Sequence, residues 1–185
     1  MQQKNEIVKK LQEGGVILYP TDTIWGLGCD ATNEESCQKI HHIKNRPKSK
    51  NLIILVDSFL MLERYVPEFS EVCYQLADLA IKPLTIIYPK AKDLAPSVVA
   101  EDGSVGIRLT KDPICLELIK GLKKPLVSTS ANLSGEHYPT CFNDVPDEIK
   151  NEVDAIIYER LDEIQVAPSQ VIKIGLDGQI KILRK

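Results

Sequence analysis

The chain has 185 residues, of which 43% are hydrophobic and 26% charged, so its length and composition are those of one soluble globular domain. This excludes a disordered chain, and no apolar run has the length of a membrane span. The formal net charge of −3 is unevenly distributed, since residues 39–50 hold five basic side chains and no acid, whereas residues 144–163 hold eight acids. This pattern suits a small anionic ligand better than an extended nucleic acid.

The cysteines and the first residues indicate a cellular compartment. The first ten residues are mostly polar and lack the apolar core of a signal peptide. The five cysteines are scattered and never form a Cys-x-x-Cys pair, which favours free thiols over disulfides or a zinc site. The three histidines also lack partners at metal-ligand spacing. We therefore expect a protein of the reducing cytoplasm that has no metal site of its own.

The first half of the sequence predicts helices that alternate with buried strands. Apolar spacing predicts a helix over residues 5–12, which Gly14-Gly15 would end. Thr32 and Glu35 form the pattern of a capping box that begins a second helix. Pro47 would close this helix and leave the basic residues before it at the helix end. Other patterns predict strands over residues 16–19 and 52–56, and helices over residues 59–65 and 71–81.

The second half predicts more strands and a final hairpin. Asp112 followed by Pro113 is typical of a helix start, and this helix would run to Gly121. The other predicted elements are strands over residues 84–88, 105–109, 125–128 and 155–158, a helix over residues 146–153, and a hairpin of residues 170–174 and 179–183. Strands alternate with helices and then crowd together. We therefore expect a single domain of the α/β or α+β class, with a mixed twisted β-sheet flanked by helices.

Two polar stretches lie where predicted elements end. The run Lys44-Asn45-Arg46-Pro47, followed by Lys48 and Lys50, supplies fixed positive charge. The run Ser128-Thr129-Ser130-Ala131-Asn132 supplies neutral hydrogen-bonding groups. A site for a nucleotide triphosphate needs both kinds of group together. Taken singly, the first run also fits a solvated helix end, and the second fits a loop that bonds its own backbone.

Two further features can contribute to a site. The run Tyr19-Pro20-Thr21-Asp22-Thr23 follows a buried strand, where hydroxyls can face a crevice, although an ordinary turn fits it too. Arg108 interrupts an otherwise apolar strand. It could face water, but a guanidinium directed into a cleft would match the carboxylate or phosphate of a substrate.

Several common catalytic motifs do not occur. The sequence has no Gly-x-x-x-x-Gly-Lys-Ser/Thr loop and no Gly-x-Ser-x-Gly elbow. Residues 26–31 match the dinucleotide fingerprint, but six residues separate them from the preceding strand. The acid expected about 20 residues later is also missing. We therefore reject a dinucleotide site.

Four blocks that occur in one order resemble a known family. They are Tyr19-Pro20-Thr21-Asp22-Thr23 with Gly26-Leu27-Gly28, then Lys44-Asn45-Arg46-Pro47, Val105-Gly106-Ile107-Arg108, and Ser128-Thr129-Ser130-Ala131-Asn132-Leu133-Ser134-Gly135. Together they look like the YrdC-like family, the threonylcarbamoyl-adenylate synthases, over about residues 14–184. The resemblance implies one YrdC-like domain without the extra carboxyl-terminal domain of longer relatives.

The resemblance also implies an activity and its residues. The activity is that of an L-threonylcarbamoyladenylate synthase, a nucleotidyltransferase that uses L-threonine, bicarbonate and ATP, releases pyrophosphate, and serves threonylcarbamoyladenosine modification of tRNA. Lys44 and Arg46 would be catalytic, offsetting charge on the leaving pyrophosphate together with Mg²⁺. The implied ATP contacts are Arg46, Lys50, Ser104, Asn132, Thr140 and Arg184. The implied L-threonine contacts are Thr23, Arg108, Ser130 and Ser169, with Arg108 on the carboxylate.

Alternative functions remain open at this point. A non-catalytic RNA-binding or ribosome-associated module would use the basic cluster on phosphates, with an affinity that falls steeply with salt. A carbamoyl-transfer module is a minor alternative. For the synthase we expect tRNA-modification proteins as partners that take up the adenylate, a weak affinity for RNA, and no membrane association.

Overall fold

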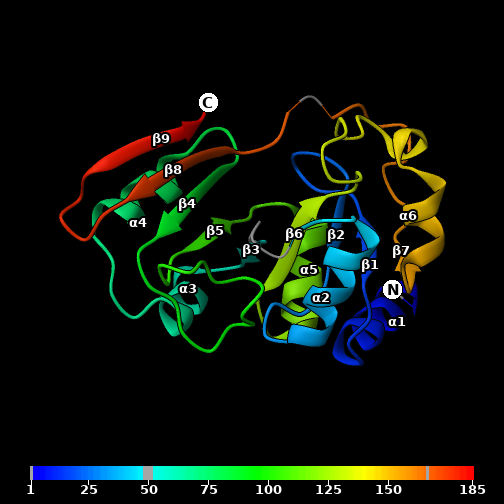
Figure 1. Cartoon of the computed structure of the whole chain (residues 1–185), viewed down its shortest axis with the longest axis horizontal. Helices are drawn as coiled ribbons and strands as arrows, with labels where there is room; N and C mark the ends of the chain where they lie inside the picture. Colours follow the sequence, from blue (N-terminus) through cyan, green and yellow to red (C-terminus); the bar gives the residue numbers. More distant parts are fainter. Residues whose placement is uncertain (1, 48–51, 166) are drawn as a thin grey trace.

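The computed structural model of the protein describes residues 2–47, 52–165 and 167–185. Within these ranges the chain forms one mixed sheet of nine strands, in the order β7-β1-β2-β6-β3-β5-β4-β8-β9. The sheet extends along the long axis of the molecule, from β7 on the right of Figure 1 to β9 on the left. The expected mixed sheet flanked by helices is confirmed.

Apart from β2 and the short turn η1, the strands and helices follow the predicted order. The strands are β1 (Ile17–Tyr19), β2 (Gly26–Gly28), β3 (Ile53–Val56), β4 (Leu84–Tyr88), β5 (Val105–Leu109), β6 (Leu126–Ser130), β7 (Ala155–Ile156), β8 (Gln170–Ile174) and β9 (Ile180–Arg184). The helices are α1 (Gln2–Gln12), α2 (Glu34–Ile43), α3 (Phe59–Tyr65), α4 (Val72–Leu79), α5 (Pro113–Leu122) and α6 (Asp147–Glu152), with a 3-10 turn η1 (Phe142–Asp144). None of the helices in these described ranges is both long enough and apolar enough to cross a membrane.

The strand β2 is absent from the sequence prediction, which considered its residues only as a dinucleotide fingerprint. It lies between β1 and β6, with Gly28 opposite Ile17. A Cβ atom on Gly28 would lie 2.7 Å from Cε1 of Tyr19 and 2.9 Å from the carbonyl oxygen of Val127. Glycine therefore leaves room for the Tyr19 ring, whose hydroxyl donates to that carbonyl at 3.2 Å. Both glycines of the fingerprint therefore lie within a strand that pairs on both sides, whereas the fingerprint places them in a turn between a strand and a helix.

The strand β6 is longer than predicted. Its pairing continues beyond Ser128, since Thr129 lies opposite Leu27 and Ser130 opposite Gly26 of β2. The hydroxyl-rich run therefore belongs to the carboxyl end of a central strand, and the prediction that it had already left the strand is wrong. Hydrogen bonds to β2 and β3 on either side hold these side chains in fixed positions.

The start of α2 corrects the predicted capping box. The N-cap is Asn33, whose Oδ1 accepts from the Ser36 amide at 3.1 Å. The Thr32 hydroxyl instead donates to Asp30 Oδ1 at 2.7 Å. Asn33 therefore caps the helix in place of Thr32, which fits the preference for asparagine over threonine at this position.

The end of α2 turns sharply. Asn45 has a left-handed φ of 47°, which asparagine tolerates better than most residues. The Arg46 amide donates to the His41 carbonyl at 2.9 Å and the Asn45 amide to the His42 carbonyl at 3.0 Å, the two bonds of a Schellman motif. This turn separates Lys44 from Arg46 and gives the two side chains different surroundings.

Candidate active site

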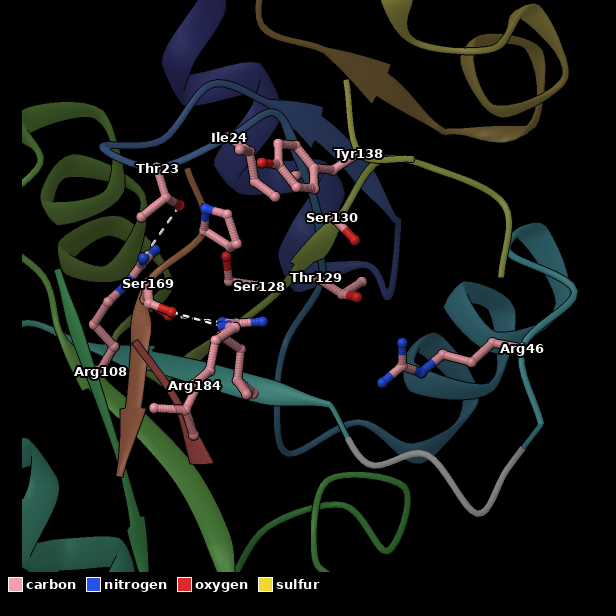
Figure 2. Close-up of a pocket in the computed structure, with 14 residues that line it drawn as sticks. Thr23, Ile24, Arg46, Arg108, Ser128, Thr129, Ser130, Tyr138, Ser169 and Arg184 are labelled. Carbon is pink, nitrogen blue, oxygen red and sulfur yellow. Dashed lines mark hydrogen bonds between the residues drawn. The ribbon is translucent and has the colours of Figure 1, made fainter. Parts of the chain in front are cut away.

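A cavity of about 230 Å³ lies where the turn after β1, the carboxyl end of β6, β5 and the start of β8 meet. Figure 2 shows the side chains around it. Six of the residues expected to bind substrates line this cavity, namely Thr23, Arg46, Arg108, Ser130, Ser169 and Arg184. They come from segments that are far apart in the sequence. The fold thus brings together residues from both predicted binding sets.

Arg108 is a fully buried charged residue that lines the cavity. It is 1% exposed, so the alternative that it faces water is wrong. Its Nη1 donates to the Thr23 hydroxyl at 3.2 Å, and its Nη2 lies 3.2 Å from Asp22 Oδ1. Its Nε and Nη2 have no hydrogen-bond acceptor. Asp22 compensates the charge at Nη2, whereas Nε has neither a hydrogen-bond acceptor nor an ion pair, and buried N–H donors are normally paired, so Nε is open to a ligand in the cavity.

The turn after β1 holds Thr23 in place. The Thr21 hydroxyl accepts from the Thr23 amide at 3.0 Å and from the Ile24 amide at 3.2 Å. The two threonine hydroxyls lie 2.8 Å apart. Thr21 is 1% exposed and Thr23 is 7% exposed. The run therefore forms a buried hydroxyl-bonded turn that presents Thr23 to Arg108.

Ser169 and Arg184 meet on the side of the cavity where Arg108 lies (Figure 2). Arg184 Nε donates to the Ser169 carbonyl at 2.8 Å, and its Nη2 contacts the Ser169 hydroxyl at 3.3 Å. That hydroxyl lies 2.8 Å from the hydroxyl of Thr85. Burial lowers the pKa of Arg184, and the positive charge of Arg108 lowers it further. The hairpin of β8 and β9 thus adds a second guanidinium to the cavity.

Lys44 is buried behind the carboxyl end of β6 and is not among the residues that line the cavity. Its ammonium donates to the Ser130 carbonyl and, at 2.6 Å, to the Asn132 carbonyl. Burial lowers its pKa to about 7, and the charge of Arg46 adds to this effect. In this structure Lys44 holds the segment that carries Ser130 and Asn132.

Arg46 extends from the end of α2 into the open side of the cavity (Figure 2). It is half-buried, and this burial lowers the pKa of its guanidinium. With Arg108 and Arg184, it makes the cavity strongly positive. An anionic ligand would offset this mutual repulsion.

Three other predicted ATP contacts, Ser104, Asn132 and Thr140, are not among the described residues that line the cavity. The Ser104 hydroxyl donates to Asp102 Oδ1 at 2.5 Å, and the Thr140 hydroxyl donates to Asp144 Oδ2 at 2.5 Å. Asn132 Nδ2 donates to the carbonyls of Leu133 and Glu136, both at 2.9 Å, while its buried Oδ1 accepts no hydrogen bond. Lys50 lies outside the described residues. Their roles as ATP contacts stay predictions.

Several cavity residues were not predicted. Tyr138, Ser128 and Thr129 line the cavity, and Asp22 pairs with Arg108. The two β6 residues belong to the hydroxyl-rich run that was singled out, and Asp22 belongs to the turn after β1. No sequence pattern marks Tyr138 as a site residue, because it lies in an irregular loop whose position depends on the whole fold.

Comparison with known proteins shows the family of the chain. The family model of the Sua5/YciO/YrdC proteins, described as telomere recombination, matches residues 9–185. The chain therefore belongs to this family, and the resemblance carried by its four sequence blocks is confirmed.

Solved structures of relatives share the fold. P. abyssi Sua5 complexed with L-threonine is 29% identical with a TM-score of 0.89, over 98% of this chain and 53% of that one. E. coli YciO is 25% identical with a TM-score of 0.85, over 100% of this chain and 89% of that one. HypF in a phosphate- and nucleotide-bound form, 21% identical with a TM-score of 0.85 over 98% of this chain and 28% of that one, shows the same fold. The chain spans about half the length of the Sua5 chains it matches.

Proposed function

We propose that the protein is an L-threonylcarbamoyladenylate synthase, which converts L-threonine, bicarbonate and ATP into threonylcarbamoyl-adenylate and pyrophosphate. The observation that supports this most is buried Arg108, which lines a cavity with hydroxyls and two more arginines and whose Nε has no hydrogen-bond acceptor. Family membership and the threonine complex of P. abyssi Sua5 support it further.

Threonine fits the end of the cavity around Arg108. Its carboxylate would accept from Nε and Nη2 of Arg108, a bidentate geometry that guanidinium groups favour, and would take the place of Asp22 beside Nη2. The hydroxyls of Thr23 and Ser169 would contact the polar groups of the substrate, and Ser130 would lie beside them. A volume of about 230 Å³ suits one small amino acid.

ATP would occupy the open side of the cavity. Arg46 and Arg184 would contact it, and Lys50, Ser104, Asn132 and Thr140 would complete the site. Ser104 and Thr140 would have to exchange their present carboxylate partners, Asp102 and Asp144, for the nucleotide. Mg²⁺ would accompany the phosphates and neutralise part of their charge.

The substrates themselves supply the nucleophiles. Bicarbonate loses hydroxide to give carbon dioxide, and the hydroxide takes a proton from the threonine ammonium and leaves as water. The amine then forms a nitrogen–carbon bond to the carbon dioxide and releases a second proton to solvent, which gives a carbamate. A carbamate oxygen then forms a bond to the α-phosphorus, and the bond from this phosphorus to the bridging oxygen breaks. Pyrophosphate leaves with that electron pair. The protein would contribute position and positive charge, from Arg46 at the leaving group and from Lys44 through the segment it holds.

The adenylate would be passed on to tRNA-modification proteins of the cytoplasm. A mixed anhydride of this kind reacts readily with water, so transfer to an acceptor must follow its synthesis. We therefore propose that its consumers are group-transfer proteins acting on tRNA adenosine.

The test is pyrophosphate release by purified protein. We expect release only when ATP, L-threonine and bicarbonate are all present. Release that persists without threonine or without bicarbonate would contradict the synthase. Absence of release, together with RNA binding that weakens steeply with salt, would favour the RNA-binding module instead.

A further inference from the structure

Arg160 lies in the segment between β7 and β8, and it is neither a predicted substrate contact nor a residue that lines the cavity. Its backbone has a left-handed φ of 57°, which costs a non-glycine residue energy and persists where contacts hold it. All three guanidinium nitrogens donate hydrogen bonds. Nη1 donates to Asp112 Oδ2 at 2.6 Å, Nη2 to the Thr21 carbonyl at 2.8 Å, and Nε to Glu163 Oε2 at 2.5 Å.

Asp112, the first of these partners, is a buried carboxylate with a second task. Its Oδ1 accepts from the amides of Ile114 and Cys115 at 2.9 Å and 3.1 Å, so it caps the start of α5. Its side chain is 3% exposed, and Arg160 compensates its charge. The contact therefore differs from an ordinary surface ion pair, which contributes little.

Thr21, the second partner, leads directly to the cavity. Its carbonyl accepts from Arg160 and, at 2.7 Å, from Gln165 Nε2. Its hydroxyl lies 2.8 Å from the Thr23 hydroxyl, which accepts from Arg108 Nη1 at 3.2 Å. A continuous run of hydrogen bonds thus joins Arg160 to the buried guanidinium in the cavity.

We propose that Arg160 is a positioning residue for the threonine half of the active site. It fixes the turn after β1 against the start of α5, and so sets the position of Thr23 beside Arg108. Arg160 touches no substrate and acts only through Thr21 and Thr23. This inference rests on the proposed function.

The experiment is calorimetric titration of L-threonine, and separately of ATP, into wild-type protein and Arg160→Ala. We expect the substitution to raise the threonine Kd about tenfold, because losing a charge-assisted hydrogen bond releases the turn that presents Thr23. The ATP Kd should stay within about twofold, since the run of hydrogen bonds leads to the threonine end. Arg160→Lys keeps the positive charge but not the planar guanidinium, so its threonine Kd should lie between those of wild type and Arg160→Ala.

Two control variants separate positioning from stability. Glu163 accepts from Nε and, at 2.9 Å, from Nη2 of Arg160; Glu163→Gln removes its charge but keeps an oxygen acceptor and leaves the bonds of Arg160 to Asp112 and Thr21, so the threonine Kd should stay within about twofold of wild type. The double variant Arg160→Ala with Asp112→Asn removes both charges while asparagine can still cap α5. It should regain thermal stability relative to Arg160→Ala, yet bind threonine as weakly.

The outcomes are distinct. A threonine Kd that is unchanged in Arg160→Ala, or one that recovers together with stability in the double variant, would overturn the positioning role while leaving the synthase intact. Equal weakening of threonine and ATP would also overturn it. If wild-type protein bound no threonine, the proposed function would fail, and this inference with it.

Discussion

Lys44 and Arg46, two positions apart in the basic run after α2, have different surroundings and therefore different roles. Lys44 is buried against the carbonyls of Ser130 and Asn132, whereas Arg46 reaches the cavity. The left-handed Asn45 between them reverses the chain and produces this division. The sequence indicated a basic helix end, but it could not separate the two side chains, because burial depends on the β6 segment that lies across Lys44.

Lys44 gives a pH-dependent prediction. Its folded-state pKa is lowered to about 7 from an ordinary 10.5, so between these values the folded state binds fewer protons than the unfolded state. The free energy of unfolding contributed by this position therefore rises with pH across that window, by at most about 1.4 kcal/mol per pH unit. Urea unfolding at several pH values should show wild type gaining stability relative to Lys44→Met from about pH 7 to about pH 9. A difference that stays constant would contradict the buried, titrating amine.

Arg108 and Arg46 allow a comparison of roles. We expect Arg108→Ala to raise the half-saturating threonine concentration by about tenfold to a hundredfold, because it removes a buried bidentate partner of the carboxylate. Arg46→Ala should mainly raise the half-saturating ATP concentration. Steady-state pyrophosphate release measures both, and circular dichroism checks that each variant is folded. Equal effects of both variants on both substrates would refute the division of roles.

At the scale of elements, most helices and strands follow from local patterns, and the errors have specific causes. β4 and β5 match their predicted bounds, because each is a short run of apolar and β-branched residues between clear breaks. β2 was not predicted, because two of its three residues are glycines, which are rare in strands. Its pairing depends on the Tyr19 ring that covers Gly28, a contact between two strands that no local pattern reveals.

Gly28 provides the test at this scale. Gly28→Ala should lower the free energy of unfolding by about 1–3 kcal/mol, since a Cβ atom would overlap the Tyr19 ring and the Val127 carbonyl. Gly26→Ala in the same strand is the matched control: its Cβ would come no closer than 3.3 Å to the Thr129 carbonyl, so it should cost less stability than Gly28→Ala. Urea unfolding of the two variants compares them. A Gly28→Ala variant as stable as wild type would show that Tyr19 does not pack closely on β2.

At the scale of the whole molecule, strand order brings the site together. β5 carries Arg108 near the centre of the sheet, the turn after β1 reaches it from one side, and the β8–β9 hairpin from the other. The sequence predicted the class of sheet but not this order, because the pairings join strands that are distant in the chain. Arg108 could still be identified locally, as an arginine in an apolar strand. Ser169 and Arg184 came only from the family resemblance, and Tyr138 and Arg160 from the structure alone.

The most direct measurement of the central claim is mass spectrometry of the product formed from ATP, L-threonine and ¹³C-labelled bicarbonate. We predict threonylcarbamoyl-adenylate in which the carbamoyl carbon carries the label, and no such product from Arg108→Ala at low threonine concentration. An unlabelled threonyl-adenylate, or no adenylate of threonine at all, would contradict the assignment.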